Sequence, residues 1–137
     1  MGLYLCVFEG DTELDGVEVG GYDDFNSFRS AVVGRLEGGS AGVKYPTLII
    51  HKDSDGEWTP EQCVELEREL RSIAAAFQDL PPSGLDSGWQ REAAKSFGLR
   101  PANLYESFID VDGELLIDRL VALCALAQEH GQPILFQ

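Results

Sequence analysis

The stretch GLYLCVFEGDTELDGVEV, residues 2–19, decides the fold class. In its first part both alternating sets of side chains are apolar, a pattern typical of a central strand. The two sets are Leu3, Leu5 and Val7, and Tyr4, Cys6 and Phe8. Turn residues follow, and then Val17 and Val19 alternate with Glu18, as expected for a half-exposed strand. The chain therefore opens with a β-hairpin and not with a β-α-β unit.

Beyond the hairpin, the apolar period changes from two to three and four, which predicts amphipathic helices. The first helix starts at Asp23 or Asp24, either of which is placed to cap it, and ends at Gly38 and Gly39. Its inward stripe comprises Phe25, Phe28, Val32 and Leu36.

A capping box, formed by Thr59 and Gln62 with Pro60 at the first helical position, predicts the start of a second helix that stops before Pro81. Its inward stripe comprises Cys63, Leu66, Leu70, Ile73 and Phe77, and Glu67 and Arg71 form an i,i+4 pair on another face.

The last helix is predicted from about residue 113 to 130, with Asp112 as its cap and Gly131 as its end. Its inward stripe comprises Leu116, Leu120, Leu123 and Ala127. Between the second and last helices, residues 81–110 receive no firm assignment: WQREAAKSF has helical tendency, and NLYESFID fits a helical turn or a strand.

Two further runs, YPTLII (45–50) and PILFQ (133–137), have the apolar, β-branched character of strands. Four strands and three or four helices after a hairpin start indicate an α+β fold. We expect a two-layer sandwich, in which amphipathic helices cover one face of a mixed or mostly antiparallel sheet. The chain is predicted to form a single domain over residues 1–137.

Composition excludes several classes of protein. The charge of −14 opposes direct binding to nucleic acid or to an anionic membrane. It serves either solubility alone or attraction of a basic partner. The three cysteines are far apart and lie in apolar or amphipathic stretches, so we expect reduced core thiols, and with no membrane span or signal peptide the predicted location is cytoplasmic.

Two acidic stretches are the candidate sites, HKDSDGEW (51–58) and DVDGE (110–114). Counted as EF-hand loops from Asp53 and Asp110, they place Val64 and Val121 where a bidentate glutamate is needed. Turn formation beside helices explains both stretches better. As partner-contact residues we predict Asp53, Asp55, Glu57 and Trp58, and second Asp110, Asp112 and Glu114.

Catalytic signatures are absent from the sequence. It contains no phosphate-binding glycine loop, and neither His51 nor His130 lies in a known nucleophile motif. No cofactor is expected. The alternative that stays open is a metal-dependent or small-molecule-binding enzyme that uses His51 with the acidic clusters.

Three ordered segments resemble the Immunity protein 70 family of bacterial polymorphic-toxin systems: MGLYLCVFEGDTELDGVEVGGYDDFNSFR, HKDSDGEW, and LYESFIDVDGELLIDRL followed by QPILFQ. The resemblance implies a cytosolic protein, encoded beside a secreted toxin, that binds and blocks the toxin. A toxin with a basic surface, such as a nuclease with a cleft for nucleic acid, would complement the acidic chain. The resemblance assigns no site residues, and the oligomeric state stays open.

Overall fold

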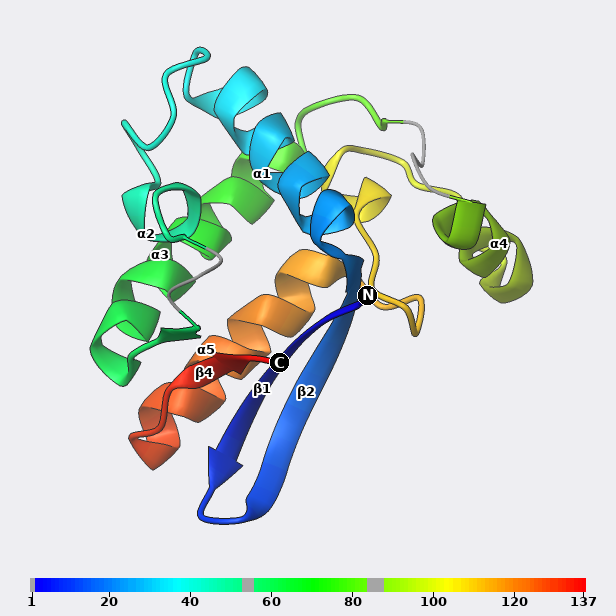
Figure 1. The fold of residues 1–137 in the computed structure, drawn as a ribbon. Helices are drawn as coiled ribbons and strands as arrows, with labels where there is room; N and C mark the ends of the chain where they lie inside the picture. The colour runs from blue at the N-terminus through cyan, green and yellow to red at the C-terminus, as the bar shows by residue number, and fades with distance from the viewer. Residues whose placement is uncertain (1, 53–55, 84–87) are drawn as a thin grey trace.

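The computed structural model describes residues 2–52, 56–83 and 88–137 of the chain, and its sheet is built around the predicted hairpin. Strands β1 (Gly2–Glu9) and β2 (Thr12–Gly21) pair antiparallel (Figure 1). Two short strands, β3 (Glu57–Trp58) and β4 (Ile134–Phe136), complete an antiparallel sheet in the order β2-β1-β4-β3. The first strand is central, as its two apolar faces predict.

Three amphipathic helices form the second layer: α1 (Tyr22–Leu36), α3 (Pro60–Phe77) and α5 (Leu116–His130). Helix α5 packs on β1 and β2, and α3 packs on α5. On β1, Leu5 and Val7 are fully buried in the core shared with these helices, whereas Tyr4 and Phe8 on the other set are only partly buried. The α+β fold is therefore confirmed, and every predicted inward position of α3 is buried.

The start of α3 and the end of α5 follow the predicted capping chemistry. Gln62 N donates to Thr59 Oγ1 at 3.2 Å, and Thr59 N donates to Gln62 Oε1 at 2.9 Å, which closes the capping box. At the end of α5, Gly131 takes a left-handed conformation with φ 63°. The start of α5 differs from the prediction, because its N-cap is Leu115 and Asp112 lies outside the helix.

The prediction of a strand at YPTLII is wrong, because this segment contains helix α2 (Pro46–Ile49). The reason lies elsewhere in the chain. The carboxylate of Glu69, on α3, accepts hydrogen bonds from Thr47 N at 3.1 Å and Leu48 N at 3.0 Å. These amides belong to the first turn of α2. A buried glutamate from another element therefore stabilises a helix start at this segment in preference to an extended strand.

The segment without a sequence assignment contains helix α4 (Gly88–Phe97) and a 3-10 turn, η2 (Tyr105–Ser107). Helix α4 lies at the side of the molecule, apart from α3 and α5 (Figure 1). Two aromatic side chains connect it to the rest of the structure: Trp89 packs over Gly20 of β2, and Phe97 packs over Gly113.

All three cysteines, Cys6, Cys63 and Cys124, are buried and free, as predicted. The Cys63 thiol donates to Trp58 O at 3.9 Å, and interaction with the Cys124 thiol of α5 lowers the pKa of Cys63, while the same interaction and burial raise the pKa of Cys124. Among the described residues, no helix combines the length and the apolar character needed to cross a membrane.

Candidate partner-binding site

The second acidic stretch forms a loop organised by Asp110. This side chain is 0% exposed, and its Oδ1 accepts hydrogen bonds from Asp112 N and Glu114 N, both at 2.9 Å. Gly113, at φ 80°, completes the turn between these two amides. The loop therefore presents Asp112 and Glu114 to solvent while Asp110 points inward.

Arg119 fixes this loop to the hairpin. Its Nε lies 3.5 Å from Asp110 Oδ2, and its Nη2 lies 3.3 Å from Asp15 Oδ1 and donates to Gly16 O at 2.7 Å. Burial raises the pKa of Asp110, and the two amide hydrogen bonds and the Arg119 charge oppose the rise. These groups enclose the Asp110 carboxylate, so the structure does not show it at the surface where its predicted role as a contact residue would place it.

A groove of about 600 Å³ lies beside the loop, at the end of the hairpin that carries Gly2 and Gly21. Val111 N donates to Glu18 O at 2.9 Å, which holds the loop against the edge strand β2. Two carboxylates, those of Glu18 and Asp24, line this groove together with Trp89. The loop and the groove thus form one acidic surface, which we call the β2-edge site: Glu18, Asp24, Trp89, Asp112 and Glu114.

The first acidic stretch is divided by the structure. Asp53 and Asp55 lie outside the described residues, and Glu57 is exposed on β3. Trp58 is 1% exposed, donates from Nε1 to Thr47 O at 3.1 Å, and packs against Phe25 and Phe136. Its apolar neighbours and the partner for its N–H place Trp58 in the core, so the structure does not show the exposed side chain that its predicted role as a contact residue would need.

His51 is packed between aromatic side chains. Its ring lies 4.6 Å from that of Trp58 and 5.1 Å from that of Phe136, and Nε2 donates to Glu57 O at 2.6 Å. These contacts give the histidine a structural part in joining the segment after α2 to β3.

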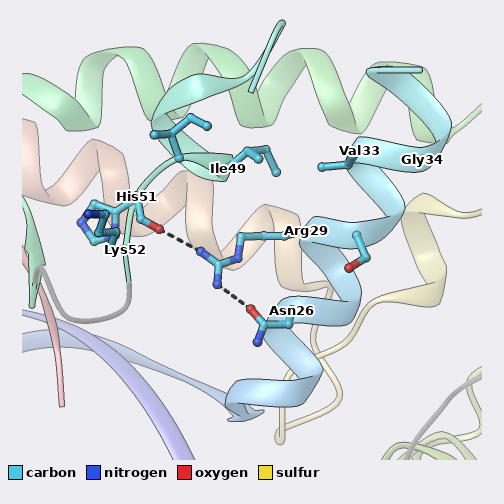
Figure 2. Close-up of a pocket in the computed structure, with 9 residues that line it drawn as sticks. Asn26, Arg29, Val33, Gly34, Ile49, His51 and Lys52 are labelled. Carbon is cyan, nitrogen blue, oxygen red and sulfur yellow. Dashed lines mark hydrogen bonds between the residues drawn. The ribbon is translucent and has the colours of Figure 1, made fainter. Parts of the chain in front are cut away.

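A second groove, of about 850 Å³, runs between α1 and residues 49–52. Figure 2 shows Arg29 reaching from α1 across this groove, where Nη1 donates to the backbone oxygen of His51 at 3.1 Å. The same side chain donates to Asn26 Oδ1 and lies over the Phe25 ring. Arg29 therefore links the two walls of the groove through its hydrogen bond to the backbone of His51.

The two acidic stretches do not converge in the part of the chain that the structure describes. Glu57 lies on β3 and the loop 110–114 contacts β2, and these strands are the opposite edges of the sheet. Among the described residues, no group of three or more histidine, cysteine or acidic side chains is placed to hold a metal ion.

Sequence reasoning missed Glu18, Asp24 and Trp89 as parts of a common site. Asp24 carried the signal of a helix start, and it does accept from Gly21 N at 2.6 Å beside the first turn of α1. Glu18 alternates with Val17 and Val19, which is the pattern of an ordinary exposed strand position. The proximity of both acids to Trp89 depends on where α4 lies beside the hairpin, with Trp89 over Gly20, and no local pattern encodes that placement.

The sheet, the three main helices and the acidic β2 edge define a small acidic α+β protein with a candidate surface for a partner. The model of the family described as Immunity protein 70 matches residues 3–136, and the chain belongs to that family. No curated protein and no solved structure matches the chain. Membership implies an immunity protein whose partner is a cognate toxin, and it suggests a role without catalysis.

Proposed function

We propose that this protein neutralises its cognate toxin by binding it stoichiometrically through complementary charge. Family membership supports the toxin as partner, and the charge of −14 supports a basic toxin surface. Acidic surfaces accelerate the encounter with a basic partner and disfavour wrong partners. In this proposal the protein works in the cytoplasm of the producing cell and catalyses no reaction.

The observation that best supports binding by complementary charge is the β2-edge site. Glu18 is exposed and lines the groove, Asp112 and Glu114 are exposed on the loop whose Val111 lines it, and Arg119 faces the inner side of that loop, toward Asp110 and Asp15. Elsewhere on the surface, Arg68 and Arg71 are paired along α3 with Glu65 and Glu67. Pairing of this kind neutralises part of α3, so the β2 edge is the more strongly acidic docking face.

Glu57 on β3 marks the second candidate face, and Asp53 and Asp55, which lie outside the described residues, stay predicted contact residues. Glu57 lies at the other edge of the sheet from the β2-edge site, so the two faces would contact different parts of a toxin. Substitutions of the acidic residues at one edge and then at the other show which of the two faces binds the toxin.

A nuclease is the class of toxin that this charge pattern fits best, because nucleases present basic clefts to phosphates. The acidic loop would then occupy the cleft in place of nucleic acid. A toxin of another class with a basic surface would be bound by the same physical means.

Co-expression with the toxin domain encoded by the adjacent gene tests the proposal. Cells that express both proteins should grow, cells that express the toxin alone should not, and the two proteins should copurify one to one. A toxin that kills equally well in the presence of this protein would contradict the proposed function.

A further inference from the structure

We propose that the groove of the β2-edge site receives an arginine side chain from the toxin, with Trp89 as its aromatic wall and Glu18 and Asp24 as its carboxylates. This inference rests on the proposed function, and it adds the residue type that enters and the place where it binds.

The wall of the groove is built by a close approach of α4 to the hairpin. A Cβ atom added at Gly20 would lie 2.5 Å from Cζ2 of Trp89, so only a glycine lets the indole lie this close to β2. The indole Nε1 donates to Asp24 Oδ2 at 3.0 Å, which fixes the ring orientation. A half-buried tryptophan held in this way is preorganised for a ligand.

The remaining lining is mainly apolar and matches the aliphatic part of a long side chain. Leu3 and Val111 contribute to the groove, and Val111 is 39% exposed. An arginine buries its methylene stem along such surface and keeps its charged head at a polar end.

The carboxylates supply the polar end. Glu18 is exposed on β2 and Asp24 lies at the start of α1, and both line the groove. A planar guanidinium can stack on an indole and bind a carboxylate with two parallel hydrogen bonds, which an ammonium cannot do. Because the described residues that line the groove include acids and no lysine or arginine, an anionic side chain or a phosphate would be repelled.

The first experiment measures binding of the adjacent-gene toxin domain by isothermal titration calorimetry. We expect Trp89→Ala to raise the Kd about 10-fold, which is the effect of losing a cation–π contact at an interface centre. Glu18→Gln should raise it about 5-fold, as the loss of one charge-assisted contact. Thermal melting reports whether each variant is folded. If Trp89→Ala does not fold, Glu18→Gln alone decides the test.

Glu129→Gln is the matched control. It removes the same charge from an exposed position on α5, next to His130, whose Nδ1 lies 2.7 Å from Glu9 Oε2 at the other end of the hairpin. If Glu18→Gln and Glu129→Gln change the Kd equally, the groove is not the arginine site, and the proposed function still stands. If wild-type protein does not bind the toxin, the proposed function itself fails.

A second experiment tests the groove without the toxin. The indole N–H signals of the two tryptophans are followed by NMR during titration with N-acetyl-arginine amide or with its neutral isostere, N-acetyl-citrulline amide. We expect the arginine compound to shift the Trp89 signal more strongly, while buried Trp58 serves as the internal reference. Equal shifts with both compounds would overturn the proposal.

Discussion

At the scale of single residues, three buried carboxylates stabilise backbone turns by accepting hydrogen bonds from amide groups. Glu37 is 5% exposed and accepts hydrogen bonds from Gly42 N at 3.0 Å and from Lys44 N and Tyr45 N, both at 2.9 Å. Glu69 and Asp110 each bind two backbone amides in the same way. An acidic composition therefore contributes to the fold as well as to the surface.

Glu37 gives a pH-dependent prediction. Burial raises its pKa, but the three amide hydrogen bonds and the Lys44 charge outweigh burial, so the folded-state pKa is lowered. A lowered folded-state pKa means that the stabilisation is present above the unfolded-state pKa and is lost as the pH falls through the folded-state pKa. Glu37→Gln should cost about 1–3 kcal/mol in urea unfolding at pH 7.

On acidification below the ordinary glutamate range, the stability difference between wild type and Glu37→Gln should shrink, because wild-type Glu37 becomes protonated. A difference that stays constant from pH 7 to the acid transition would show that the carboxylate charge does not hold this loop.

Asp110 and Asp112 give a matched pair, because they are identical residues two positions apart in one loop. Asp110→Ala removes the acceptor of two amides and leaves Arg119 with less of its counter-charge, so it should cost about 2–3 kcal/mol. Asp112→Ala changes an exposed side chain and should cost less than about 0.5 kcal/mol. Equal losses in chemical unfolding would contradict the assigned roles.

The sequence could not distinguish these two aspartates, because both belong to the same DxDG pattern. It predicted a turn there, and the turn is present. Which carboxylate points inward depends on Arg119, in the helix that follows the loop, and on the hairpin residue Asp15, which lies far away in the sequence and holds Arg119 in place. Trp58 is a similar case: an acidic neighbourhood suggested exposure, and strand pairing with Ile134 placed it inside.

At the scale of elements, the best predictions were those with a local physical cause. The capping box, the glycine at the end of α5 and the helical stripes depend on side chains within one turn of each other, and the structure has all of them. The strand prediction for YPTLII is wrong because the cause of its structure is not local. Its β-branched composition favours a strand, and the carboxylate of Glu69 on α3 stabilises a helical turn instead.

This explanation of α2 predicts the effect of Glu69→Gln. The amide group would present a donor to one of the two backbone N–H groups, so the variant should lose about 2 kcal/mol of stability. Hydrogen exchange at Thr47 and Leu48 should accelerate more than exchange in α5. Glu65→Gln, on the exposed face of the same helix, is the control. If α2 exchanges at the same rate in both variants, Glu69 does not hold it.

At the scale of the whole molecule, the fold class and the acidic character could be predicted from the sequence, whereas the binding face could not. The β2-edge site is assembled from β2, α1, α4 and the loop before α5, and these elements meet only through tertiary packing. That the chain forms one domain stays a prediction, supported by a core that extends from Leu3 of β1 to Ile134 of β4.

Charge complementarity with the toxin is the central claim, and the salt dependence of binding tests it most directly. Calorimetry of the purified protein with the adjacent-gene toxin domain should give one-to-one binding in about 20 mM NaCl. The association should weaken markedly in about 300 mM NaCl, where the screening length is shorter than the extent of the acidic surface. No binding, or binding of equal strength at both salt concentrations, would contradict the account.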